Sequence, residues 1–113
     1  MQRSSLQEIA KNTLTQEANA LLELRNFIND EFDKVVQLLL ATKGRLVVSG
    51  IVKSAIIGQK IVANLNSTVT PSNFMHAADA IHGDLGMIRE EDVVMIISKS
   101  GESPEIRVLV TLI

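Results

Sequence analysis

VVMIISKSGESPE, residues 93–105, is the stretch from which the fold can be predicted. Its first part, residues 93–97, is apolar and mostly β-branched, which predicts a strand of a parallel sheet that is buried on both faces. A short polar loop follows, and Pro104 is at home in the first turn of a helix. Ser103 comes one residue earlier, at the position of an N-cap. The stretch therefore predicts a strand, a serine-rich loop and a helix N-terminus.

The loop of this unit carries groups that suit a phosphate. Ser98, Ser100 and Ser103 supply hydroxyls, and Lys99 supplies an ammonium group. They stand beside free backbone N–H groups at the positive end of a helix, where phosphates bind readily. The alternative is an ordinary turn whose serines only cap the helix, since serine-rich turns are common. The loop by itself leaves both interpretations open.

Composition excludes several classes of protein. A chain of 113 residues allows one domain with a modest core. The net charge of −2 argues against a nucleic-acid partner, and the lack of cysteine excludes disulfides and thiolate metal sites. No apolar run is long enough to span a bilayer, and the N-terminal residues lack the apolar core of a signal peptide. We expect a cytoplasmic protein with no membrane partner.

Two amphipathic helices are predicted before the first strand. Apolar residues recur at three- and four-residue spacing over residues 4–28, and a second helix is predicted over residues 30–41. Asn29 or the next residue can cap the start of the second helix, and Gly44 can close its end. These helices either cover one face of a sheet or pair with another subunit.

A second strand–loop–helix unit follows the two helices. The pattern predicts a strand over residues 45–49, a turn over residues 50–54 and a helix over residues 55–66. The turn matches neither the Walker A pattern nor the dinucleotide fingerprint. Its Lys53 is either a solvated surface lysine or a site residue, because ligands of open α/β sheets bind at the carboxyl ends of the strands.

The segment between these units contains both histidines. A short strand is predicted over residues 72–75, then one or two helical turns over residues 76–81, and a fixed non-helical loop over HGDLGMI, residues 82–88. A pair formed by His76 and His82 has no obvious third ligand, so no metal is predicted. His82 is either a hydrogen-bonded structural histidine or a proton donor and acceptor.

Together these segments resemble the sugar isomerase (SIS) domain, and most closely arabinose-5-phosphate isomerases. RLVVSGIVKSAIIGQKIVANLNST, HGDLGMI and DVVMIISKSGESPEI stand in the order and spacing of that family. The resemblance runs from about residue 30 to residue 113. It implies an α/β fold with a doubly wound parallel sheet, in a flavodoxin-like strand order of the type 2-1-3. We expect one domain overall, with helices over residues 1–42 and an incomplete SIS domain over residues 43–113, the N-terminal half of the usual domain.

The resemblance also implies a sugar-phosphate site at the carboxyl ends of the strands, without metal or cofactor. The phosphate-binding residues would be Ser98, Lys99, Ser100, Ser103 and Ser54. The catalytic residues would be Lys53, Glu105 and His82.

The chain departs from the family in two respects. The family pattern G-M-G-K-S-G has glycine where this chain has Val52 and Ala55. If Val52 adopts a positive φ, its backbone is strained as glycine would not be. The family's sheet also needs further strands, and further active-site residues, beyond the helix that begins at Pro104.

The implied reaction interconverts an aldose phosphate and a ketose phosphate, arabinose 5-phosphate and ribulose 5-phosphate, through an enediol. Lys53 would stabilise the oxyanion, Glu105 or a glutamate outside this chain would be the base, and His82 would assist ring opening. The alternatives are a sugar-phosphate binding or regulatory module, and a fragment with little function alone.

The predicted strand order leaves one edge of the third strand unpaired. Because an apolar edge and apolar helix stripes favour association, we expect a homo-oligomer.

Overall fold

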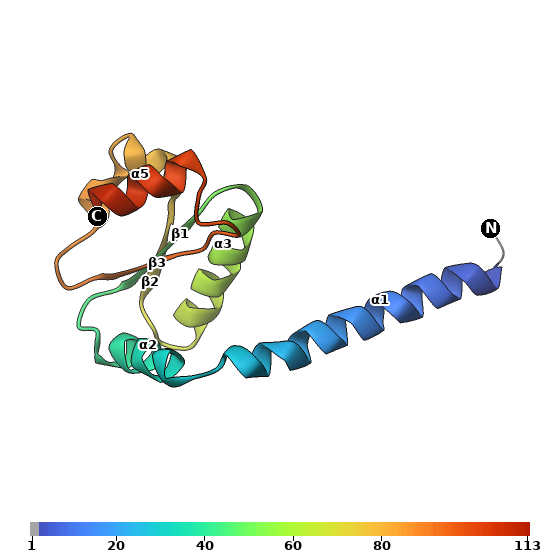
Figure 1. Cartoon of the computed structure of the whole chain (residues 1–113). Coiled ribbons are helices and arrows are strands. Elements are labelled where there is room, and N and C mark those ends of the chain that lie inside the picture. The colour runs from blue at the N-terminus through green and yellow to red at the C-terminus, as the bar shows by residue number, and fades with distance from the viewer. Residues whose placement is uncertain (1–2) are drawn as a thin grey trace. The chain divides into compact units, whose positions relative to one another are not determined.

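The computed structural model describes residues 3–113, which divide into two compact units at the junction between Gln37 and Leu38. The first unit is helical and contains α1 (Arg3–Leu24), the 3-10 turn η1 (Arg25–Phe27) and the start of α2 (Asp30–Ala41). The second unit holds the sheet with the helices that pack on it (Figure 1). Within residues 3–113, none of the helices combines the length and the apolar character that crossing a membrane requires.

The two predicted N-terminal helices are confirmed, with adjusted ends. The first helix stops at Leu24 and gives way to the 3-10 turn, so it is shorter than predicted. The Asn29 side-chain oxygen accepts hydrogen bonds from the backbone N–H groups of Glu31 at 3.1 Å and Phe32 at 3.4 Å. Asn29 therefore caps α2, as the sequence predicts.

The prediction that Gly44 closes α2 is wrong. The helix already ends at Ala41, and the Gly44 N–H donates to the Glu91 carbonyl at 3.2 Å. A Cβ on Gly44 would lie 2.5 Å from that carbonyl and from the Asp92 carboxylate. The residue is needed for a close approach of two chain segments rather than for a helix C-cap.

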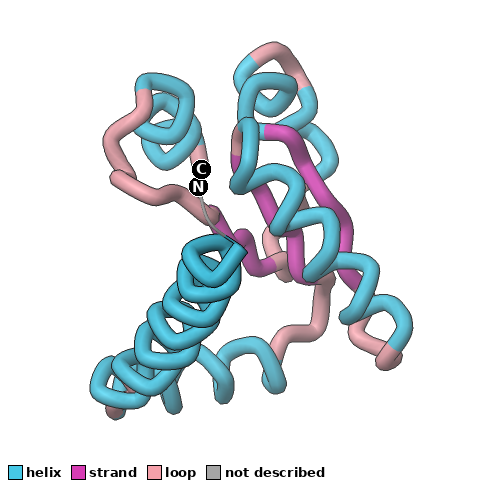
Figure 2. Tube along the Cα trace, turned by 90° about the vertical axis from the view of Figure 1, so that its right-hand side faces the viewer, coloured by secondary structure: helices cyan, strands magenta, loops and turns pink. Residues whose placement is uncertain are grey.

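The sheet consists of three parallel strands in the order β2-β1-β3, as predicted. The central strand β1 (Leu46–Gly50) pairs with β2 (Ser72–His76) on one side and β3 (Val93–Ile96) on the other. Figure 2 shows the strands in magenta, with helices around them. Leu46 pairs with Ser72 and with Val93, so the carboxyl ends of the strands meet at one edge of the sheet.

Helices cover both faces of the sheet, as in a doubly wound fold. On one face, α3 (Val52–Ser67) approaches closely at Gly58, where a Cβ would lie 3.0 Å from Phe74 and 3.1 Å from Val48. On the other face, Val47 and Met75 pack with residues of α4 (Ala77–Ile81) and α5 (Pro104–Leu112). Adjacent strand residues point to opposite faces, which explains why neighbouring valines of β1 enter different cores.

The burial predicted for residues 93–97 is wrong. Every residue of β1 is buried, whereas the four residues of β3 are only half-buried. The reason is position, since β3 lies at the edge of the sheet and β1 at its centre. An apolar run of β-branched residues predicts a strand, but the place of that strand in the sheet decides how far it is buried.

Several predicted boundaries also change. The helix predicted from residue 55 begins at Val52, because Val52 has a φ of +52° and turns the chain from β1 directly into α3. HGDLGMI is not free of helix, because it contains the 3-10 turn η2 (Asp84–Met87). Gly83, with a φ of +135°, separates η2 from α4.

Candidate functional site

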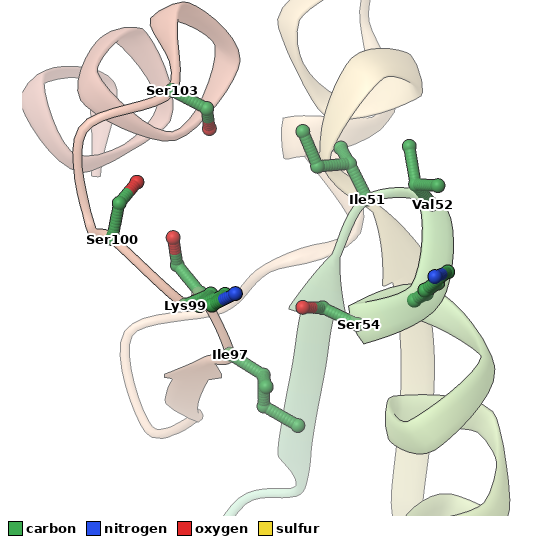
Figure 3. A pocket seen from close by; sticks show the side chains of 9 residues that line it. Ile51, Val52, Ser54, Ile97, Lys99, Ser100 and Ser103 are labelled. Atoms are coloured by element: carbon green, nitrogen blue, oxygen red, sulfur yellow. The ribbon is translucent and has the colours of Figure 1, made fainter.

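A cavity of about 240 Å³ lies at the carboxyl edge of the sheet, between the turn that follows β1 and the loop that follows β3 (Figure 3). Nine residues line it: Ile51, Val52, Lys53, Ser54, Ile97, Ser98, Lys99, Ser100 and Ser103. These two segments are far apart in the sequence. They meet because parallel strands deliver the loops after their carboxyl ends to the same edge.

Six predicted site residues line this cavity. The serine-rich loop supplies Ser98, Lys99, Ser100 and Ser103, and the first turn of α3 supplies Lys53 and Ser54. Both lysines are exposed, so their ammonium groups are open to an incoming anion. The predicted juxtaposition of the two turns is therefore present in the folded chain.

The serine-rich loop is shaped by its own hydroxyls. The backbone N–H of Gly101 donates to Ser98 Oγ at 2.9 Å, and the N–H of Glu102 donates to Ser100 Oγ at 3.1 Å. Gly101 has a φ of +71°, which a side chain at this position would disfavour. Because each serine oxygen serves as an acceptor, its own O–H hydrogen stays available for a ligand.

Ser103 occupies the N-cap position of α5 but makes no capping hydrogen bond. The predicted position is correct, and the predicted capping role is wrong. Its Oγ is buried and has no hydrogen-bond partner within residues 3–113. In Figure 3 this hydroxyl points toward the space between the two segments. An unsatisfied buried hydroxyl costs about 1–3 kcal/mol, a cost that a bound acceptor would remove.

Two helix N-termini border the cavity, and neither has a side-chain cap. Ile51 stands at the N-cap of α3 and has no oxygen to offer, while Ser103 does not bond to α5. The first N–H groups of both helices therefore lack a side-chain acceptor. With Lys53 and Lys99 beside them, these helix ends favour a negatively charged ligand.

Two predicted catalytic residues do not line the cavity. Glu105 is half-buried in the first turn of α5, and His82 is exposed at the end of α4. The backbone N–H of His82 donates to the Asp79 carbonyl at 3.0 Å. Among the described residues, the cavity wall thus carries cations, hydroxyls and apolar groups but no carboxylate or imidazole. The catalytic roles of Glu105 and His82 stay predictions.

The predicted site residues do not include Ile51, Val52 or Ile97. All three line the cavity, and they form its apolar part. The absence of glycine at position 52 was a usable signal, because a β-branched residue with a positive φ is rare. The predicted strain is present, since Val52 has a φ of +52°.

His76 is a further residue without an assigned role. It ends β2 opposite Gly50, its ring lies edge-on to Phe74 at 6.1 Å, and its Nδ1 is buried without a partner among the described residues. Across residues 3–113, no three His, Cys, Asp or Glu side chains gather as a group that could hold a metal ion.

The SIS domain family model matches residues 39–112, a range that includes every residue of the cavity. The chain belongs to the SIS domain family. This assignment agrees with the three-stranded order of the sheet and with the serine-rich loop after β3.

Several relatives of this SIS chain are named as arabinose 5-phosphate isomerases. It is 48% identical over 108 residues to a Haemophilus influenzae protein named as a probable arabinose 5-phosphate isomerase. It is 50% identical over 104 residues to the arabinose 5-phosphate isomerase KdsD of Pseudomonas aeruginosa. These alignments cover 96% and 92% of this chain and 32% of each relative.

A solved structure of an Escherichia coli CFT073 protein in complex with arabinose 5-phosphate superimposes with a TM-score of 0.92 and 38% identity. A Listeria monocytogenes chain matches with a TM-score of 0.91 and 30% identity. The alignments cover 99% and 98% of this SIS chain, and 60% and 59% of those chains. The chain therefore spans about a third of the curated relatives and about three-fifths of the solved ones.

Proposed function

We propose that this chain is the sugar-phosphate-binding part of an aldose–ketose isomerase that acts on arabinose 5-phosphate. The observation that carries the proposal is the cavity in which two uncapped helix N-termini, two lysines and the serine-rich loop converge. Such a cavity suits a phosphate dianion, and relatives at 48–50% identity are named for this substrate. We also propose that the chain is cytoplasmic.

The phosphate would be held by Ser98, Lys99, Ser100 and Ser103, with Ser54 facing them from α3. Each serine can donate its O–H to a phosphate oxygen, and Lys99 adds a charge-assisted hydrogen bond. In Figure 3 the Ser54 hydroxyl points toward the side of the cavity where Lys99 lies. Binding energy from the phosphate would position the sugar carbons for reaction.

The isomerisation would move a proton between C2 and C1 of the open-chain sugar. Removal of the C2 proton forms an enediolate, a proton then passes from the O2 hydroxyl to O1, and return of a proton to C1 gives ribulose 5-phosphate. Lys53, the cation on the α3 side, would stabilise the oxyanion of this intermediate. Glu105 would move the proton and His82 would assist ring opening, either directly or together with residues of a longer polypeptide.

The second candidate function is a sugar-phosphate binding or regulatory module. It is favoured by one observation, the lack of a carboxylate or imidazole among the described residues that line the cavity. Proton transfer needs a base within hydrogen-bond reach, whereas binding of the phosphate needs none. A binding module would therefore keep its affinity for arabinose 5-phosphate without turning it over.

The deciding measurement is ribulose 5-phosphate formation from arabinose 5-phosphate by the wild-type chain, Lys53→Ala and Lys60→Ala. Lys60 is a matched control, because it is an exposed lysine of the same helix and does not line the cavity. We expect turnover to fall by about a hundredfold or more in Lys53→Ala and to stay unchanged in Lys60→Ala.

The contrary results separate the alternatives. Thermal stabilisation by arabinose 5-phosphate without turnover would support the binding module instead. Absence of both turnover and stabilisation would reject both functions for this chain alone. Equal activity of the two lysine variants would remove Lys53 from the mechanism.

A further inference from the structure

The two segments that form the cavity differ in charge. The serine-rich loop and the first turn of α5 carry Lys99 together with two acids, Glu102 and Glu105. On the other side, α3 brings Lys53 to the cavity and contains no acid. The whole stretch of residues 34–78 has no Asp or Glu. The α3 side is therefore positively charged, whereas acids accompany the lysine of the loop side.

The charge of Lys53 is not neutralised by the protein. Its side chain is exposed, and within residues 3–113 the salt bridge that forms joins Arg45 to Asp92 instead. Ile51, at the N-cap of α3, has no side-chain oxygen to accept from the first N–H groups of the helix. The N-terminal end of α3 thus adds roughly half a positive charge to that of the ammonium group.

The proposed substrate leaves this side of the cavity without a counter-charge. When the serine-rich loop holds the phosphate, the opposite end of the sugar faces α3, as the positions of Ser100 and Ser54 in Figure 3 illustrate. Both arabinose 5-phosphate and ribulose 5-phosphate are uncharged at C1 and C2. Negative charge arises there only in the enediolate, which Lys53 would stabilise. A ligand with a permanent anion at C1 would match the charge of the α3 side in its stable form.

We propose that the α3 side of the cavity is a second anionic subsite, which binds the carboxylate of aldonate 5-phosphates. These sugar acids have a carboxylate in place of the C1 aldehyde, so one molecule presents a phosphate to the serine-rich loop and a carboxylate to Lys53. The inference rests on the proposed function, which assigns the phosphate to that loop. An aldonate has no aldehyde to isomerise, so it occupies the site and excludes arabinose 5-phosphate.

The test compares D-arabinonate 5-phosphate with D-arabinitol 5-phosphate by calorimetry. Both are open chains with the same phosphate, and they differ only at C1, which is a carboxylate in one and an alcohol in the other. We expect the wild-type chain to bind the arabinonate about fivefold more tightly at low ionic strength, the upper range for an exposed ion pair. This preference should shrink as salt is added, because salt screens exposed charges.

Two lysine variants locate the subsite. Lys53→Ala should abolish the preference for the arabinonate. Lys60→Ala should keep it, because Lys60 is an exposed lysine of the same helix that does not line the cavity. D-arabinonate 5-phosphate should also displace D-arabinose 5-phosphate from the wild-type chain in a competition titration.

Equal affinity of the wild-type chain for the arabinonate and the arabinitol would overturn the second subsite. A preference that survives in Lys53→Ala, or that Lys60→Ala loses to the same extent, would overturn the role of Lys53. Binding of the arabinonate without displacement of D-arabinose 5-phosphate would place it outside the cavity and overturn the inference as well. Failure of the wild-type chain to bind any of the three sugar phosphates would instead overturn the proposed function, and this inference with it.

Discussion

At the scale of single residues, the hydroxyl of Ser103 is the most informative group of the site. It is buried at the start of α5 without a hydrogen-bond partner among residues 3–113, although serine at an N-cap normally bonds to the helix. A buried donor without an acceptor destabilises the empty protein. Because Ser103 lines the cavity, a bound phosphate oxygen would supply the missing acceptor.

Replacing Ser103 by alanine separates binding from stability. We expect Ser103→Ala to leave the Tm unchanged or to raise it, since no hydrogen bond is lost. The affinity for arabinose 5-phosphate should fall by about tenfold, as for the loss of one hydrogen bond to a charged group. Calorimetry measures the affinity, and thermal unfolding measures the Tm.

Ser67→Ala is the control, because the Ser67 hydroxyl donates to the Ala63 carbonyl within α3 at 2.9 Å, away from the cavity. A lower Tm with unchanged affinity in Ser103→Ala would assign this serine to the fold alone.

At the scale of elements, Asp92 joins the start of β1 to the turn before β3. Its carboxylate accepts hydrogen bonds from the backbone N–H of Arg45 at 2.8 Å and of Arg89 at 2.9 Å. The Arg45 guanidinium lies 4.0 Å from the same carboxylate. These backbone hydrogen bonds, more than the nearby charges, lower the pKa of Asp92 below its ordinary value of 3.8. These contacts of Asp92 lie at the amino edge of the sheet, opposite the cavity.

The depressed pKa of Asp92 predicts a dependence of stability on pH. The ionised carboxylate stabilises the folded chain, so its contribution is fully present well above pH 3.8 and is lost as the pH falls through the lower folded-state pKa. We expect Asp92→Asn to unfold at a lower temperature than the wild-type chain at pH 7. The difference should shrink as the pH falls below about 4, where both side chains become neutral. Thermal unfolding over a pH series measures this difference in unfolding temperature.

Glu90→Gln alters an exposed acid of the same turn and should show a much smaller difference. A difference between Asp92→Asn and the wild-type chain that stays constant at every pH would refute the predicted pH dependence.

At the scale of the whole molecule, large apolar side chains remain exposed in each unit. In the first unit, Leu14 and Leu21 of α1 are 67% and 68% exposed and lie seven residues apart, on one helix face. In the second unit, one edge of β3 has no neighbouring strand within the described residues. Exposed apolar stripes and open strand edges both favour association.

We therefore predict that the chain forms a homodimer or a larger homo-oligomer, as expected from its sequence. Light scattering at micromolar concentration measures the mass. The double variant Leu14→Glu with Leu21→Glu should lower that mass, because burial of carboxylates in an apolar interface is unfavourable. Asn12→Glu with Gln16→Glu adds the same charge to another face of α1 and should leave the mass unchanged. A monomeric wild-type chain would contradict the prediction.

The sequence by itself determined the parallel strands, their order, the helix at Pro104 and the loops that form the cavity. The strands, the helix and the loops follow from local causes, namely β-branched apolar runs and turn chemistry, whereas the strand order was implied by the resemblance to the SIS family. Tertiary structure decided the rest. Burial of β3 depends on its place at the edge, and the orphan hydroxyl of Ser103 depends on what packs around it. The apolar wall at Val52, and the absence of Glu105 and His82 from the cavity, arise from how separate loops meet in space, which no local pattern encodes.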